Sequence, residues 1–132
     1  MINISRINHV GLRVRDLTVT RAFYEKLGFQ FLVGPVGPEP VAIMEHPSGV
    51  NFNFILNGDA DDSPNILMDV PEKHPGYTHV ALEVPDLAAA RAQLEALGIP
   101  LSGGPIELPD GASMMFIRDP DRNVIEFHQP AG

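Results

Sequence analysis

The chain has 132 residues, 44% of them hydrophobic and 20% charged, with 17 acidic residues against 9 basic ones and no cysteine. This length suits one domain, or two small halves that share a core. The formal charge of -8 argues against nucleic acids and anionic membranes as partners, and the lack of cysteine excludes disulfides, thiolate metal sites and a cysteine nucleophile. Because there is no signal-peptide segment and no apolar run of about 20 residues, we expect a cytoplasmic protein.

The sequence contains an internal repeat. Residues 9–17 and 79–87 both begin with a histidine, match at most apolar positions and lie 70 residues apart. The match continues without a gap to the Leu-Gly pairs that end at Gly28 and Gly98. A constant offset over about 20 residues indicates a duplicated structural unit.

Each half predicts a strand, a helix and three further strands, in that order. Alternating apolar and polar residues indicate the first strand, and apolar residues at helical spacing follow it. Asp16 and Asp86 stand where the N-caps of these helices belong, and Gly28 and Gly98 stand where glycine ends a helix. The expected strands are 9–14, 29–33, 41–45 and 50–56 in the first half and 79–84, 100–102 or 105–108, 112–118 and 123–128 in the second. The expected helices are 17–27 and 87–97. The apolar face of the first helix is expected to consist of Leu17, Ala22, Phe23 and Leu27.

The duplication predicts an α+β fold made of two βαβββ units. The units cover about residues 5–57 and 77–129, and a polar linker, 58–76, joins them and includes Asp61 and Asp62. One such unit leaves one sheet face without a helix, so we expect two units to pair and enclose these faces. The expectation is a single domain, 1–132, whose paired curved mixed sheet encloses a cleft.

Polar side chains are expected on the sheet face that the helices do not cover. His9 and His79 open the first strand of each half and alternate with the apolar residues that pack under the helix. Glu126 and His128 face the same way in the last strand, and Asn53 takes the place of Glu126 in the first half. A buried carboxylate is costly unless it is paired or binds a metal. Two imidazoles and a carboxylate suit divalent Fe, Mn, Ni, Co or Zn, so we predict a metal site of His9, His79 and Glu126.

The chain resembles the vicinal oxygen chelate superfamily over about residues 5–129. The resemblance rests on the paired His-Val-x-Leu-x-Val-x-Asp-Leu segments, the Leu-Gly helix ends and the segment 119–127, Asp-Pro-Asp-Arg-Asn-Val-Ile-Glu-Phe. That family includes glyoxalase I, methylmalonyl-CoA epimerase, fosfomycin-resistance enzymes, extradiol dioxygenases and metal-free bleomycin-resistance proteins. The resemblance implies metal ligands at His9, His79 and Glu126 and, as in small relatives, a homodimer.

The expected function is that of a divalent-metal-dependent enzyme that chelates a small substrate through two adjacent oxygens. Lyase or isomerase chemistry of glyoxalase type and ring-cleaving dioxygenase chemistry are both open; the alternative is a metal-free, bleomycin-resistance-like protein that sequesters a small apolar compound. The family's fourth ligand position falls on Asn53, whose amide cannot act as a base, which argues against glyoxalase I itself. His128 and Glu45 are the candidate catalytic acid/base residues, and Met114 and Phe116 are expected to face the cleft.

Overall fold

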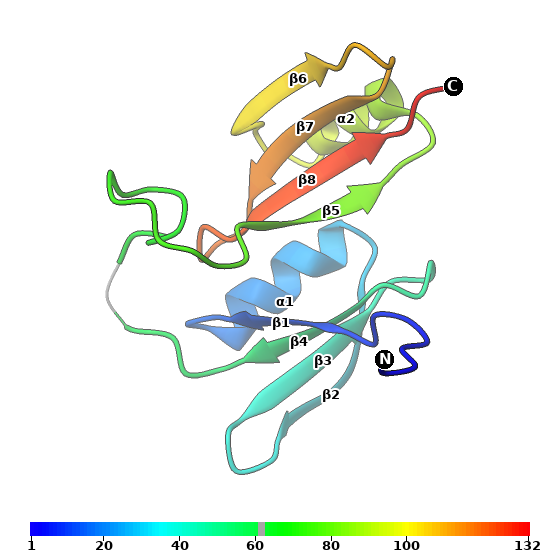
Figure 1. Ribbon diagram of the computed structural model, residues 1–132. Coiled ribbons are helices and arrows are strands. Elements are labelled where there is room, and N and C mark those ends of the chain that lie inside the picture. Colours follow the sequence, from blue (N-terminus) through cyan, green and yellow to red (C-terminus); the bar gives the residue numbers. More distant parts are fainter. Residues whose placement is uncertain (61–62) are drawn as a thin grey trace. The chain divides into compact units, whose positions relative to one another are not determined.

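The computed structural model describes residues 1–60 and 63–132; Asp61 and Asp62 of the predicted linker lie outside these residues. The chain divides into two compact units, Met1–Ser63 and Pro64–Gly132. Each unit consists of one helix and one four-stranded mixed sheet (Figure 1). The predicted α+β class and the two βαβββ units are therefore confirmed, whereas the joining of the units into a single domain stays a prediction.

The first unit places its first and last strands side by side. Its elements are β1 (Val10–Arg13), α1 (Leu17–Lys26), β2 (Gln30–Val36), β3 (Val41–Glu45) and β4 (Asn51–Ile55). The strand order is β1-β4-β3-β2, in which β1 and β4 are parallel and the other pairs antiparallel. A parallel pair needs a long connection, and here a helix and two strands supply it.

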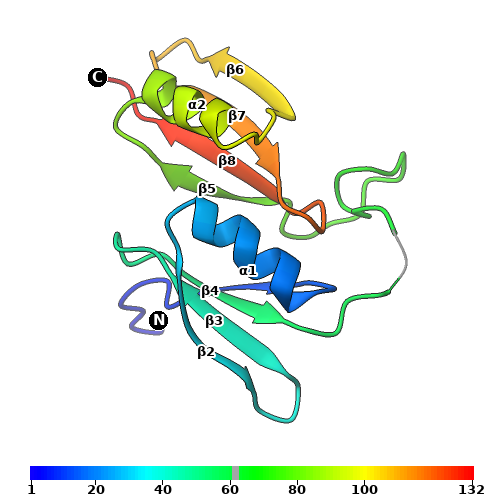
Figure 2. The ribbon, with the colours of Figure 1, turned by 180° about the vertical axis from the view of Figure 1, so that it is seen from behind.

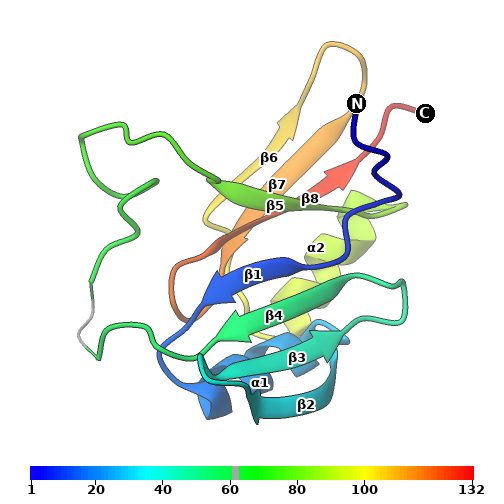
Figure 3. The same cartoon turned by 60° about the horizontal axis from the view of Figure 1, so that its bottom comes forward.

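The second unit repeats this arrangement. Its elements are β5 (His79–Glu83), α2 (Leu87–Ala96), β6 (Gly103–Glu107), β7 (Ser113–Arg118) and β8 (Val124–Gln129), in the strand order β5-β8-β7-β6 with β5 and β8 parallel. Of the two ranges expected for the second strand of this unit, β6 overlaps 105–108. Figure 2 shows α2 along one face of this sheet, and Figure 3 shows the loop that leads into β5. No helix among the described residues has the length and hydrophobicity of a membrane span.

Both helices are capped at the predicted residues. The Asp16 carboxylate accepts a hydrogen bond from the backbone N–H of Thr18 at 2.9 Å, and Asp86 caps α2 through the N–H of the third residue after it. Gly28 and Gly98 follow the last helical turn with φ values of 96° and 74°, a left-handed conformation that glycine adopts without strain. The sequence repeat is therefore also a repeat of helix caps.

Tyr24 organises the core of the first unit, although periodicity alone does not identify it. Its side chain is fully buried, and its ring centroid lies 5.5 Å from that of Phe52 and 4.8 Å from that of Phe54. The expected apolar face of the helix included Ala22, which is exposed; Thr20 and Tyr24 are buried instead. The reason is the sheet beneath α1: the Phe52 ring packs edge-on and the Phe54 ring packs tilted against Tyr24, and these rings fill more space against a tyrosine ring than against an alanine methyl group.

Two glycines 70 residues apart, beyond the region where the halves visibly match, let neighbouring strands approach closely. Gly34 in β2 and Gly104 in β6 have φ values of 138° and 81°. A Cβ atom at Gly34 would lie 2.5 Å from the Cα of Ala42, and one at Gly104 would lie 2.8 Å from the carbonyl oxygen of Met114. Both positions exclude any larger residue, and both lie where the strand register shifts.

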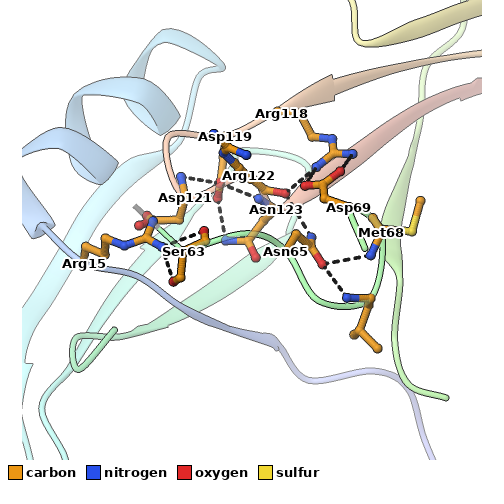
Figure 4. Close-up of polar contacts among 11 residues, drawn as sticks. Arg15, Ser63, Asn65, Met68, Asp69, Arg118, Asp119, Asp121, Arg122 and Asn123 are labelled. Atoms are coloured by element: carbon orange, nitrogen blue, oxygen red, sulfur yellow. Dashed lines mark hydrogen bonds and ion pairs between the residues drawn. The ribbon is translucent and has the colours of Figure 1, made fainter. Parts of the chain in front are cut away.

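The turn between β7 and β8 is built around the buried carboxylate of Asp119. This carboxylate accepts hydrogen bonds from the backbone N–H of Asp121 at 2.9 Å, from the backbone N–H of Asn123 at 2.8 Å and from the side-chain amide of Asn123 at 2.9 Å (Figure 4). Three donors offset the cost of removing the charge from water. The turn thereby fixes the start of β8, the strand that carries Glu126.

A segment of the predicted linker is folded against this turn. Arg118, at the end of β7, forms a bidentate ion pair with Asp69 in which both N···O distances are 2.9 Å (Figure 4). Asn65 donates from its side-chain amide to the carbonyl oxygen of Arg122 at 3.0 Å. The hydrogen bonds from the Arg118 guanidinium hold the pKa of the Asp69 carboxyl below its ordinary value of 3.8. The charge of Arg118 is therefore neutralised from within its own unit.

Replacing Gly34 by alanine is expected to lower the free energy of unfolding by about 2–4 kcal/mol, because the new Cβ collides with the backbone of Ala42. Gly49→Ala is the matched control: Gly49 also has a positive φ, but nothing lies within 4 Å of its Cβ position, so the expected cost is about 1 kcal/mol. Urea unfolding of both variants measures the difference. Equal losses would show that the close approach of β2 to β3 is unimportant for stability.

Replacing Asp69 by asparagine is expected to destabilise the protein by about 1 kcal/mol at neutral pH. Since the folded-state pKa of Asp69 is lowered, its contribution is present above the ordinary pKa of 3.8 and is lost as the pH falls through the lower folded-state value. Urea unfolding across the acid range checks this: the gap between wild type and Asp69→Asn should close below pH 3.8. Asp59→Asn, at an exposed position, is the control and should leave the stability at neutral pH unchanged.

Candidate metal centre

The face of the second sheet opposite α2 carries three of the predicted site residues. Ile125 and Phe127 are buried on the helix side of β8, so Glu126 and His128 point to the other face, as alternation predicts. His79 opens the neighbouring strand β5, which runs parallel to β8. We call this surface the non-helical face of the second sheet.

Glu126 contacts two imidazoles, one with each carboxylate oxygen. Its Oε1 lies 3.1 Å from Nε2 of His79, and its Oε2 lies 2.8 Å from Nδ1 of His128. The Glu126 side chain is only 9% exposed, whereas the His79 and His128 side chains are 36% and 31% exposed. Within the described part of the chain, no arginine or lysine pairs with this carboxylate. A nearly buried carboxylate with only imidazole partners is a site that a cation can complete.

The donor atoms fit a divalent metal ion. Two ligand atoms about 2.1 Å from one ion and at a right angle to each other lie about 3.0 Å apart. The separation between Nε2 of His79 and Oε1 of Glu126, 3.1 Å, is close to this value. The same separation also suits an N–H···O hydrogen bond when no ion is bound. Imidazole nitrogen and carboxylate oxygen are suitable ligands for Mn, Fe, Co, Ni and Zn.

Apolar side chains flank the carboxylate on this face. Phe116 and Met114 are the register partners of Glu126 and His128 across the β7–β8 pair, which confirms that they share the non-helical face. The ring of Phe116 lies edge-on to the His79 imidazole, with 6.1 Å between centroids. A molecule bound beside the carboxylate would therefore meet an aromatic ring and a thioether.

The first unit holds the remaining predicted residues. His9 directly precedes β1 and is exposed. Asn53 lies in β4 next to β1, at the place that Glu126 takes in β8 next to β5, so an amide stands where the second sheet has its carboxylate. Glu45 ends β3, two residues beyond the register partner of Asn53, and therefore shares the face of Asn53.

Of the three predicted metal ligands, the structure brings two within contact distance of each other. His79 and Glu126 belong to the second unit, and His9 belongs to the first. Across residues 1–60 and 63–132, no three His, Cys, Asp or Glu side chains form a group that could hold a metal ion. The complete ligand set of His9, His79 and Glu126 therefore stays a prediction.

Two residues that contact candidate ligands are not among those predicted from the sequence. Asn8 Oδ1 lies 2.8 Å from Nδ1 of His9, and Thr78 Oγ1 lies 2.8 Å from Nδ1 of His79. Their only signal in the sequence is position: each precedes a repeated histidine, and each has a side-chain oxygen. Because Asn8 and Thr78 are different residue types, comparing the two halves for identical residues does not identify them.

Comparison with known proteins identifies relatives along most of the chain. The chain is 30% identical over 151 residues to a lactoylglutathione lyase of Schizosaccharomyces pombe, and 34% identical over 102 residues to a mitochondrial methylmalonyl-CoA epimerase of Bos taurus. These alignments cover 94% and 70% of the chain but 45% and 54% of the relatives, so the chain spans about half the length of both.

Solved structures share the fold, and a family model matches nearly the whole chain. A glyoxylase/bleomycin resistance protein/dioxygenase domain from Frankia superposes with a TM-score of 0.74 at 24% identity, covering 96% of this chain and 93% of that one. A mutant of the fosfomycin resistance protein FosX from Listeria monocytogenes, complexed with Mn(II) and 1S,2S-dihydroxypropylphosphonic acid, superposes with a TM-score of 0.68 at 16% identity, covering 96% and 90%. Since the family model matches residues 6–127, the chain belongs to the Glyoxalase/Bleomycin resistance protein/Dioxygenase superfamily, the vicinal oxygen chelate family that its sequence resembles.

Proposed function

We propose that this protein is a divalent-metal-dependent enzyme that binds a small substrate through two adjacent oxygen atoms, with His9, His79 and Glu126 as the metal ligands. The observation that carries the proposal is the nearly buried Glu126 carboxylate, whose Oε1 lies 3.1 Å from Nε2 of His79. A carboxylate in this environment needs a positively charged partner, and a divalent ion supplies one.

The relatives support a metal and favour one class of reaction. The Listeria FosX mutant with the same fold was crystallised with Mn(II), and Fe, Ni, Co and Zn suit the same ligands. The relatives at 30% and 34% identity are named as a lyase and an epimerase. We therefore favour lyase or isomerase chemistry over ring cleavage.

The side chains near the proposed ligands define the kind of substrate. When bound, the ion supplies Lewis acidity that stabilises negative charge on a substrate oxygen. Phe116 and Met114 form an apolar wall beside Glu126. Arg118 lies farther along β7, but its bidentate ion pair with Asp69 neutralises its charge. The proposed substrate therefore presents an uncharged, apolar group to this wall.

Proton transfer is assigned to His128 and Glu45. Asn53 cannot take up a proton, because an amide is not a base at neutral pH. Nδ1 of His128 is engaged by Glu126, while no hydrogen-bond partner of its Nε2 occurs among the described residues, which leaves this atom available for a substrate proton. Glu45 is a carboxylate on the same face of the first sheet as Asn53, where it is a second candidate base.

Protein purified without a metal-affinity tag and stripped with a chelator is expected to bind Mn(II), Co(II) or Zn(II) in a ratio of about one ion per chain. His79→Ala and Glu126→Gln each remove a ligand, so each should weaken binding by about 100-fold or more. Isothermal titration calorimetry measures both the stoichiometry and the affinity.

His74→Ala is the control for these variants, since His74 is an exposed imidazole outside the proposed site and its loss should leave binding unchanged. Equal affinities of wild type and His79→Ala would contradict the ligand assignment. A wild-type chain that binds none of Fe(II), Mn(II), Ni(II), Co(II) and Zn(II) would overturn the metal enzyme and favour the metal-free, bleomycin-resistance-like binding of an apolar compound.

A further inference from the structure

The two candidate imidazole ligands are held in the same way, each by the residue before it. The distance from the side-chain oxygen to Nδ1 is 2.8 Å for the pair Asn8 and His9, and 2.8 Å for the pair Thr78 and His79. Both pairs stand at the same place in their repeats, immediately before or at the start of the first strand. An amide in one half and a hydroxyl in the other thus make the same contact to the repeated histidine.

In the first unit, this contact determines which ring nitrogen carries the hydrogen. A neutral imidazole has one N–H group and one nitrogen with a lone pair. The amide oxygen of Asn8 can only accept, so Nδ1 of His9 donates to it and Nε2 keeps the lone pair. Nε2 is therefore the atom of His9 that is available to a metal ion.

In the second unit, the contact allows two states of the ring, because the hydroxyl of Thr78 either donates or accepts. Nε2 of His79 lies 3.1 Å from the carboxylate oxygen Oε1 of Glu126. Because two lone pairs would repel at this distance, without an ion the ring hydrogen belongs on Nε2, and the hydroxyl then donates to Nδ1. For Nε2 to bind an ion, its proton must leave to solvent and Nδ1 must take one up, after which Nδ1–H donates to the hydroxyl oxygen. The ring carries one proton in both states.

We infer that Asn8 and Thr78 are positioning residues that present Nε2 of His9 and His79 to a metal ion, an inference that rests on the function proposed above. Both imidazoles are accessible to solvent: His9 is exposed, and 36% of the His79 side chain is exposed. Without a partner at Nδ1, such rings would turn about their side-chain bonds and exchange tautomers. A fixed Nδ1 removes this freedom before the ion binds, as outer partners of metal-bound histidines commonly do.

The tautomers are observable in the unaltered protein with Zn(II), a diamagnetic ion, as the probe. Long-range ¹H–¹⁵N NMR spectra are recorded at a pH of about 8.5, above the ordinary pKa of imidazole. His9 is expected as the Nδ1–H tautomer with and without zinc. His79 is expected to change from Nε2–H to Nδ1–H when zinc is added. These spectra need no substitution.

Substitutions test the same inference through affinity. Thr78→Val removes the hydroxyl at nearly constant volume and should weaken zinc binding about tenfold, whereas Thr78→Ser should bind zinc like wild type. Asn8→Ala should also lose about tenfold, since His9 then lacks its acceptor. The matched controls are Thr18→Val and Asn3→Ala, at exposed positions that do not contact His9 or His79, and both should leave zinc affinity unchanged.

Two results would overturn the inference while the proposed function stands. The first is that Thr78→Val and Asn8→Ala both bind zinc as tightly as wild type, while His79→Ala binds zinc much more weakly. The second is that the His9 ring carries its hydrogen on Nε2. A wild-type chain that binds no divalent ion would defeat the proposed function and the inference together.

Discussion

The proposed site depends on one constraint: the Glu126 carboxylate is almost completely removed from water, and its partners are two imidazoles. The fold fixes this position firmly. Ile125 and Phe127, on either side of Glu126, belong to the core, and the buried Asp119 carboxylate sets the turn from which β8 begins. A shift of this strand by one residue would bury a charge against α2, so the carboxylate is held on the non-helical face.

The duplication gives each unit the same arrangement of strands, and the two units differ at the position of the proposed ligand Glu126. Asn53 stands where a symmetrical repeat would have a second carboxylate. If the proposed ligands His9, His79 and Glu126 held a divalent ion, the ion and its ligands would carry a net charge of about +1, which a second carboxylate would cancel. A larger residual charge makes the ion a stronger Lewis acid for a substrate oxygen. Because Asn53 cannot act as a base, the first unit has no base at the position that corresponds to Glu126. Proton transfer is therefore proposed for other residues, His128 and Glu45.

The sequence predicts what local rules determine. Alternation identifies the faces of β8, and the caps at Asp16 and Asp86 follow from residue type and position. It does not predict Tyr24 in place of Ala22, because the choice depends on rings supplied by a distant strand. The Arg118–Asp69 pair joins residues far apart in the chain and has no local pattern. Homodimer assembly and the full ligand set stay predictions, because each depends on contacts beyond a single unit. Cytoplasmic location also stays a prediction.

The most direct test is anomalous diffraction at the manganese absorption edge from crystals of the Mn(II)-loaded protein. With the proposed ligand set, one strong anomalous peak should lie within coordination distance of Nε2 of His9, Nε2 of His79 and Oε1 of Glu126. A peak ligated by other side chains, or no peak beside Glu126 in crystals grown with excess Mn(II), would contradict it.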